Sequence, residues 1–181
     1  AGLELALDIH SDEKQDLALL SQNGWILVDP VAVARTPQDY QAYIQASKAE
    51  FGVAKSMYVK TQGGWISDRT VCYLASGKPV VVQRTGLRSY LPSGAGILEF
   101  STVDEAAEAL ATVNANYEKH CRSAREIAEA YFDARRTAEH VHAQARVVGQ
   151  GVHPREAGEG ERLRGRVLLE GDPVLRHLRH R

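Results

Sequence analysis

The sequence predicts an α/β fold in which a parallel sheet carries helices on both faces. Short apolar runs of strand type alternate with helix-type segments along residues 3–148, the order that parallel strands with crossover connections produce. The runs are nearly continuous in apolar residues, as in strands buried on both sides. Because such crossovers are right-handed, the strands would form a Rossmann-like layer sandwich, followed by C-terminal helices.

Three strands and two helices are predicted in the first part of the chain. Ser11 is a suitable N-cap for the first helix, and Asn23-Gly24 would stop it. Thr36-Pro37 would start the second helix, since proline suits the first turn. In order, the elements are a strand over 3–9, a helix over 12–22, a strand over 25–28, a helix from 36 and a strand over 51–54.

The second part continues the same alternation. Thr102 and Glu105 have the spacing of a capping box, which predicts a helix start. The elements are a loop over 55–67, a helix over 68–75, strands over 80–82 and 97–100, the capped helix from 102, a charged helix over 116–132 and a helical stretch to about 148.

Composition and charge narrow the class of protein. The chain has 181 residues and a hydrophobic fraction of 44%, which suits one globular domain with a core of ordinary size. A formal net charge of -1 argues against nucleic-acid binding through bulk electrostatics. No apolar run reaches the roughly 18 residues that a membrane span needs. We therefore expect neither a nucleic-acid partner nor a membrane span.

The two cysteines, Cys72 and Cys121, lack the CxxC spacing of a metal or redox motif. Free thiols suit a reducing compartment, so a cytoplasmic location is expected. The chain has no initiating methionine and no signal peptide, and it opens directly on a strand-like run. These features predict a piece of a longer protein.

Residues 149–181 differ in composition from the rest of the chain. They lack Lys, Ser, Thr, Asn, Ile and aromatic residues and are rich in Arg, Gly, Glu, Leu and His. Such a segment predicts disorder. A frameshifted or read-through end and a basic tail that binds an anionic partner are the alternatives. The predicted organisation is a Rossmann-like domain over 1–132, a helical extension over 133–148 and this low-complexity tail over 149–181.

Polar and glycine residues follow three of the predicted strands. Ligands bind at the carboxyl ends of the strands in an open parallel sheet. The loops that leave strands here are His10-Ser11, residues 55–69 and residues 83–96, and we expect all three at one edge of the sheet. His10 is equally well interpreted as a structural hydrogen-bonding residue or as part of a site.

The second of these loops has the features of a phosphate site. Gly63-Gly64 would let the backbone approach a ligand closely. Ser67 and Asp68 lie at the expected start of a helix, where N–H groups and the helix dipole favour a phosphate, and Asp68 suits a sugar hydroxyl. Arg69 could bind the phosphate through two hydrogen bonds. Each feature also has a structural interpretation, as a turn, a cap or a surface ion pair, but together they favour an anionic ligand.

Other residues of these loops complete the candidate site. Thr85-Gly86 offers a hydroxyl and an exposed backbone, and Lys55 a further positive charge. No catalytic triad, dinucleotide fingerprint or P-loop is visible. His140 and His142 fall on different faces of a helix, so no metal site is predicted. No catalytic residue is assigned.

The stretch GGWISDRTVCYLASGKPVVVQRTG, residues 63–86, resembles the nucleotide-sugar-binding half of GT-B glycosyltransferases, where a loop and helix end in an A-x-G-x-PVV pattern. It is most similar to bacterial GT-B enzymes with the segments GW-x-SDR, YLASG-PV, Q-x-TG and LP-x-G-G. The upstream segments NGW-x-LVDP and AEFGVAK fit the same group. The resemblance covers roughly residues 3–133.

The resemblance implies one half of a GT-B fold, which would bind a nucleoside-diphosphate sugar for transfer to an acceptor hydroxyl. It implies no cofactor and no metal, so helix N-terminal amides and basic side chains would meet the charge of the leaving diphosphate. The N-terminal acceptor domain of such an enzyme is absent, so the chain alone would bind the donor without turnover. The candidate donor-binding residues are Lys55, Gly63, Gly64, Ser67, Asp68, Arg69, Thr85 and Gly86, with His10 as an additional candidate.

Two departures from the family pattern bear on function. Cys72 stands where many retaining enzymes have the second of two glutamates, and Arg84 stands where relatives have Asp. These departures favour the alternative of a non-catalytic nucleotide- or sugar-phosphate-binding module, a degenerate transferase. A flavodoxin-like or response-regulator-like interaction domain is a further alternative, for which Asp8 and Asp12 alone would supply the acidic cluster.

Overall fold

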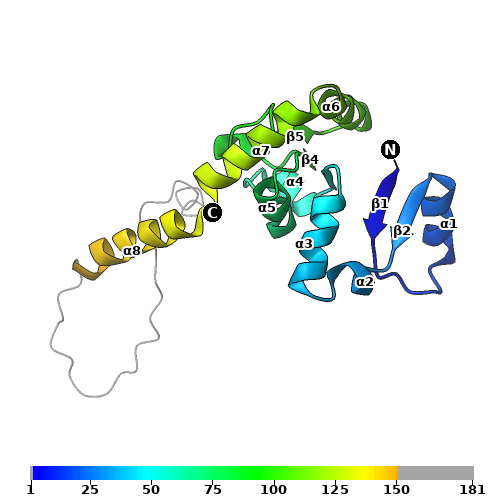
Figure 1. Cartoon of the computed structure of the whole chain (residues 1–181), viewed down its shortest axis with the longest axis horizontal. Coiled ribbons are helices and arrows are strands. Elements are labelled where there is room, and N and C mark those ends of the chain that lie inside the picture. The colour runs from blue at the N-terminus through cyan, green and yellow to red at the C-terminus, as the bar shows by residue number, and fades with distance from the viewer. Residues whose placement is uncertain (1, 151–181) are drawn as a thin grey trace, which may run out of the picture.

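The computed structural model describes residues 2–150 and confirms the α/β class, with parallel strands and helices packed around them (Figure 1). The elements in chain order are β1 (Leu3–Ala6), α1 (Lys14–Gln22), β2 (Trp25–Val28), α2 (Pro30–Ala34), α3 (Pro37–Ala46), β3 (Glu50–Gly52), α4 (Ser56–Thr61), α5 (Asp68–Ala75), β4 (Val80–Gln83), the 3-10 helix η1 (Leu87–Ser89), β5 (Ile97–Phe100), α6 (Val103–Ala115), α7 (Tyr117–Tyr131) and α8 (Ala134–Gln150).

The strands form two separate parallel sheets. Within the described residues β1 pairs with β2 alone, with Leu3 opposite Trp25, while β3, β4 and β5 form a second sheet in that order. In the second sheet Val80 lies between Glu50 and Ile97. The expectation of one continuous sheet is therefore wrong. Alternating strands and helices predict the elements and their direction, but not which strands share backbone hydrogen bonds.

Side-chain contacts join the two sheets. The ring of Trp25 on β2 lies 6.4 Å from the ring of Phe51 on β3, with the planes tilted by 49°. The hydroxyl of Tyr43 on α3 donates a hydrogen bond to Oε2 of Glu4 on β1, at 3.4 Å. No side chain of β1, α1, β2 or α2 is fully buried. The core of the described chain therefore lies around the three-stranded sheet.

Strand β4 forms the centre of this core. Successive side chains of a strand point to opposite faces, and Val80 and Val81 are both 0% exposed. Val80 packs with apolar side chains of α3, α5 and α7, including Ile44, Leu74 and Ile127. Val81 packs with the apolar face of α6. Helices thus cover both faces of the three-stranded sheet (Figure 1), as predicted.

Threonine side chains cap two of the predicted helices. Thr36 accepts a hydrogen bond from the N–H of Asp39 at 3.1 Å, and Thr102 accepts one from the N–H of Glu105 at 3.2 Å. The Glu105 carboxylate accepts in return from the N–H of Ser101 at 2.6 Å. The expected starts of α3 and α6 are therefore confirmed, since these bonds satisfy N–H groups that the first turn leaves free.

Ser11 does not cap α1 as expected. Instead, His10 accepts hydrogen bonds from two N–H groups that precede the helix. The N–H of Asp12 donates to Nδ1 of His10 at 3.3 Å, and the N–H of Glu13 donates to the His10 carbonyl at 3.0 Å. The chain therefore forms a turn at His10, and α1 begins at Lys14, later than the sequence suggests.

Helix α4 occupies part of the predicted loop over 55–67. Its six residues, SMYVKT, include Tyr, Val and Thr, which favour strands at least as much as helices. Gln62 ends the helix with φ 49, in the left-handed region. A helix this short has no periodicity that the sequence could reveal.

Helix α8 confirms the helical stretch predicted to reach about residue 148. The predicted disordered tail over 149–181 lies, apart from its first two residues, outside the described part of the chain. The boundaries of the three predicted segments stay predictions. None of the helices between residues 2 and 150 combines the length and apolar character needed to cross a membrane.

His120 is a buried ionisable side chain on α7. It is 3% exposed, and its Nδ1 accepts a hydrogen bond from the N–H of Gly96 at 3.3 Å. Burial lowers the pKa of His120 below its ordinary value, and the positive charge of Lys119 lowers it further. Because a proton on Nδ1 would remove the acceptor that Gly96 uses, the fold favours neutral His120.

We expect the free energy of unfolding to fall as the pH drops below about 6.5, the ordinary pKa of histidine. The folded-state pKa is the lower one, so the unfolded chain binds the proton first. The stabilisation is complete above the unfolded pKa and is lost as the pH falls through the folded one. In His120→Asn the amide oxygen can replace Nδ1 without titrating. Between about pH 7.5 and about pH 5, the free energy of unfolding measured with urea should fall further for the wild type than for His120→Asn. Equal losses would exclude His120 as the cause.

Candidate functional site

An open depression lies where β3 and β4 end and α5 begins. It is open to solvent. Its lining comes from both strands, from the loop before α5 and from the first turn of α5. Residues that line it include Glu50, Gly52, Trp65, Ser67, Arg69 and Gln83. The carboxyl edge of a parallel sheet is where ligands are expected.

Reciprocal hydrogen bonds join the two loops at this edge. The N–H of Gly64 donates to the carbonyl of Thr85 at 2.7 Å, and the hydroxyl of Thr85 donates to the carbonyl of Trp65 at 2.7 Å. Nε2 of Gln62 donates to the carbonyl of Arg84 at 3.2 Å. We call this contact between residues 62–65 and 84–86 the loop clasp. Thr85 is 2% exposed, so in this structure its hydroxyl serves the clasp.

Glycine is required on both sides of the loop clasp. Gly64 has φ +76, and a Cβ there would overlap the ring of Tyr90. Gly86 has φ +87, and a Cβ there would overlap the carbonyl of Gln62. Glycine alone adopts such angles without strain. These two predicted residues thus shape the loops, whereas Gly63 is exposed and has no comparable constraint.

Trp65 lies at the rim of the depression. Its ring stacks on that of Tyr58 of α4, with centroids 4.5 Å apart and planes within 6° of each other. The residue nevertheless remains 36% exposed. A partly exposed aromatic ring beside a depression can stack on a ring of a ligand.

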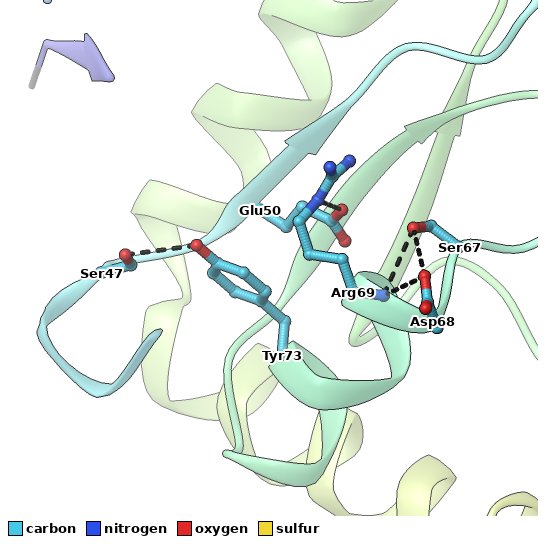
Figure 2. Close-up of polar contacts among 6 residues, drawn as sticks. All are labelled: Ser47, Glu50, Ser67, Asp68, Arg69 and Tyr73. Carbon is cyan, nitrogen blue, oxygen red and sulfur yellow. Dashed lines mark hydrogen bonds and ion pairs between the residues drawn. The ribbon is translucent and has the colours of Figure 1, made fainter. Parts of the chain in front are cut away.

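The start of α5 is capped by its own side chains. Oγ of Ser67 and Oδ1 of Asp68 both accept from the N–H of Arg69, at 3.3 Å and 3.0 Å (Figure 2). The capping role that the sequence allows for both residues is therefore present. Ser67 also lines the depression, while Asp68 is exposed.

Arg69 forms an ion pair with a buried glutamate, Glu50 of β3. Its Nε donates to Oε1 of Glu50 at 2.7 Å, and Figure 2 shows the two terminal nitrogens pointing away from the carboxylate. Glu50 is 3% exposed, and its Oε2 has no hydrogen-bond partner among the described residues. Burial lowers the pKa of Arg69, but the hydrogen bond and charge of Glu50, together with the nearby Tyr40 and Tyr73, raise it above its ordinary value, so the guanidinium stays charged.

Two tyrosines lie close to this ion pair. Burial, together with the neighbouring Cys72, raises the pKa of Tyr40 to about 12. Burial also raises the pKa of Tyr73, whose hydroxyl donates to Oγ of Ser47 at 3.3 Å (Figure 2). Both phenols are therefore neutral at physiological pH and add no charge to the ion pair between Arg69 and Glu50.

Lys55 and His10 do not line the depression. Lys55 is exposed and occupies the N-cap position of α4. His10 is exposed and lies 3.6 Å from Asp12, measured from Nδ1 to Oδ2. The loop after β1 does not join the loops after β3 and β4, contrary to expectation, because β1 belongs to the other sheet.

Glu50 and Gln83 line the depression. In the sequence, Gln83 belongs to the loop over 83–96 without being named among the donor-binding residues, and nothing there points to Glu50. Oε1 of Gln83 accepts the N–H of Ala54 at 3.1 Å, which ties the ends of β3 and β4 together. For Glu50 the sequence offered no clear signal, because a charged residue at the start of a strand is usually exposed. For Gln83 the signal was its position as the last residue of a valine-rich strand.

The depression can accept an anion on one side and a ring on the other. Arg69 supplies positive charge, and Trp65 supplies an aromatic surface. Between residues 2 and 150, no three His, Cys, Asp or Glu side chains are grouped so that they could hold a metal ion. That the reaction needs no metal stays a prediction.

We expect Gly86→Ala to disrupt the loop clasp. Alanine at this φ costs about 1–2 kcal/mol in backbone strain, and the overlap with the Gln62 carbonyl should raise the total to about 2–4 kcal/mol. The matched variant is Gly94→Ala, where φ is +102 and no atom lies within 4 Å of the added Cβ. It should cost the strain alone, about 1–2 kcal/mol. Urea unfolding compares the two, and equal losses would show that the close contact does not matter.

Comparison with known proteins identifies the family. A family model described as glycosyl transferase-like matches residues 10–148, which is most of the chain and includes every residue that lines the depression. Neither the curated proteins nor the solved structures contain a match to this chain. The family supports a glycosyl-transfer function at a coarse level, so the resemblance noted in the sequence is confirmed to that extent. The chain belongs to the glycosyl transferase-like family.

Proposed function

We propose that this chain binds the nucleoside-diphosphate sugar donor of a glycosyltransferase, and that the donor lies in the depression beside α5. One observation carries the proposal. A half-exposed arginine with both terminal nitrogens unpaired among the described residues lines a depression at the carboxyl edge of the sheet, against the amino end of a helix. Family membership makes a glycosyl donor the most suitable anion.

Arg69 and the start of α5 would bind the diphosphate. The terminal nitrogens of a guanidinium match two phosphate oxygens, and a helix N-terminus favours negative charge. The leaving diphosphate gains charge as the glycosidic bond breaks, so these groups would stabilise the transition state more than the ground state. In this proposal Gly64, Thr85 and Gly86 act through the loop clasp, which sets the shape of the site.

The sequence resemblance supports three further parts of the proposal. These are the GT-B arrangement, a reaction that needs no metal, and an acceptor domain outside this chain. The alternative of a non-catalytic module drew support from Cys72, which stands in place of a glutamate, and from the reversed charge at Arg84. The structure directs that side chain elsewhere, with Nη2 3.8 Å from Oε2 of Glu105 on α6, and Arg84 does not line the depression. Arg84 therefore gives no reason to prefer the alternative.

We expect the full chain to bind one of UDP, TDP and GDP in a calorimetric titration, and Arg69→Ala to weaken that binding at least about tenfold through loss of a charge-assisted contact. The variant also leaves Glu50 buried without its partner, which lowers stability. Arg88→Ala is the matched control, because it strips Glu99, also buried, of a bond of 2.6 Å.

Arg88 does not line the depression, so Arg88→Ala should lower the melting temperature without changing nucleotide affinity. Absence of binding by all three nucleotides to the wild type would refute the donor-binding proposal. Equal weakening by both variants would mean that stability, rather than a contact from Arg69, controls binding.

Tryptophan fluorescence offers a second test. The chain has two tryptophans, of which Trp65 lines the depression and Trp25 lies on β2 of the other sheet. Nucleotide binding should change the emission of the wild type and of Trp25→Phe, because a base or sugar near Trp65 alters its surroundings. Nucleotide binding should leave the emission of Trp65→Phe unchanged. A signal that survives in Trp65→Phe and disappears in Trp25→Phe would place the ligand elsewhere.

A further inference from the structure

We propose that Glu50 is a positioning residue, which orients Arg69 so that its terminal nitrogens face the phosphate groups of the ligand. This inference rests on the proposed function, since it concerns how the same site holds its anion. Glu50 would act through Arg69 rather than bind the anion itself, because its carboxylate is 3% exposed and repels negative charge.

The geometry of the hydrogen bond supports this role. Arginine can present either its Nε side or its two terminal nitrogens to an anion. Here Glu50 occupies Nε alone, at 2.7 Å, and the terminal nitrogens Nη1 and Nη2 bond to no described residue. The bond therefore leaves Nη1 and Nη2 unoccupied. This end of the guanidinium can bind phosphate through two parallel contacts.

The location of the two residues makes this orientation useful. Glu50 lies on β3, which pairs with the buried strand β4, so the core holds the backbone that carries its carboxylate. A free arginine side chain samples many rotamers, and ordering it on binding costs affinity. Glu50 holds Arg69 in one orientation before the ligand binds and so removes part of that cost. Both residues line the depression.

A second ion pair on the same sheet shows that the bond alone does not mark a site. Glu99 of β5 is also buried, on the same face as Glu50, and accepts from Nε of Arg88 at 2.6 Å. Neither Arg88 nor Glu99 lines the depression. The two pairs are therefore matched in chemistry and differ in position, which gives the experiment its control.

Charge and positioning predict opposite effects of removing Glu50. If Glu50 acts through its negative charge alone, its loss should make an anion bind more tightly. If Glu50 orients Arg69, its loss should make an anion bind more weakly. Glu50→Gln keeps the side-chain length and an oxygen that can still accept from Nε, so it should retain part of the orientation.

The test is calorimetric titration of the full chain with inorganic pyrophosphate, and separately with UDP, TDP and GDP. The wild type should bind pyrophosphate most tightly, Glu50→Gln more weakly, and Glu50→Ala at least about tenfold more weakly than the wild type. Variants that bind as tightly as the wild type, or more tightly, would overturn the positioning role. Should Glu50→Ala fail to fold by circular dichroism, Glu50→Gln decides the question alone.

Glu99→Gln and Glu99→Ala should leave pyrophosphate affinity unchanged, whatever they do to the melting temperature. Equal weakening in the Glu50 and Glu99 variants would reduce Glu50 to a structural residue and overturn the proposal.

The two probes separate this inference from the proposed function. Nucleotide binding that does not depend on Glu50 rejects the positioning role and retains the donor site. Pyrophosphate binding that depends on Glu50, without binding of any nucleotide, supports the positioning role and rejects the nucleotide-sugar donor. A wild type that binds neither probe rejects both.

Discussion

Burial of β4 on both faces is the constraint on which the rest of the structure depends. Val80 and Val81 are enclosed by helices on opposite sides of the sheet, and this burial holds β4 between β3 and β5. With β4 held in place, Gln83 lies at its end and ties it to the end of β3. The loop clasp follows immediately. The groups around the depression are therefore attached to a rigid edge, which is what a preorganised binding site requires.

The polar residues of the same sheet connect the fold to the site. A buried carboxylate is costly unless it is paired, so Glu50 on β3 needs a positive partner from outside the sheet. Arg69 on α5 fulfils this need and at the same time faces the depression. The ion pair thus adds to the apolar contacts of Tyr73 and Leu74 that hold α5 on the sheet. One residue contributes both to the attachment of the helix and to the charge of the site.

Local signals made several elements predictable from the sequence. The bounds of β2, α5 and β5 agree with those expected, because short apolar runs and the Ser67 cap mark them within a few residues. Contacts between distant residues were not predictable. Arg69 and Glu50 lie 19 positions apart, and the residue that pairs with a half-exposed arginine depends on which strand is adjacent. Thr85 could be placed near the site, but whether its hydroxyl would face a ligand or the Trp65 carbonyl depends on how the two loops meet.

The separation of the strands into two sheets has a consequence for how the molecule opens. No backbone hydrogen bond between β1 or β2 and the three-stranded sheet exists in the described residues, and no side chain of β1 or β2 is fully buried. Residues 3–28 can therefore unfold as a local unit while the ladder of β3, β4 and β5 stays intact. Amide protons of β1 and β2 then exchange with solvent through this small opening, whereas those of β4 exchange only when the core itself is lost.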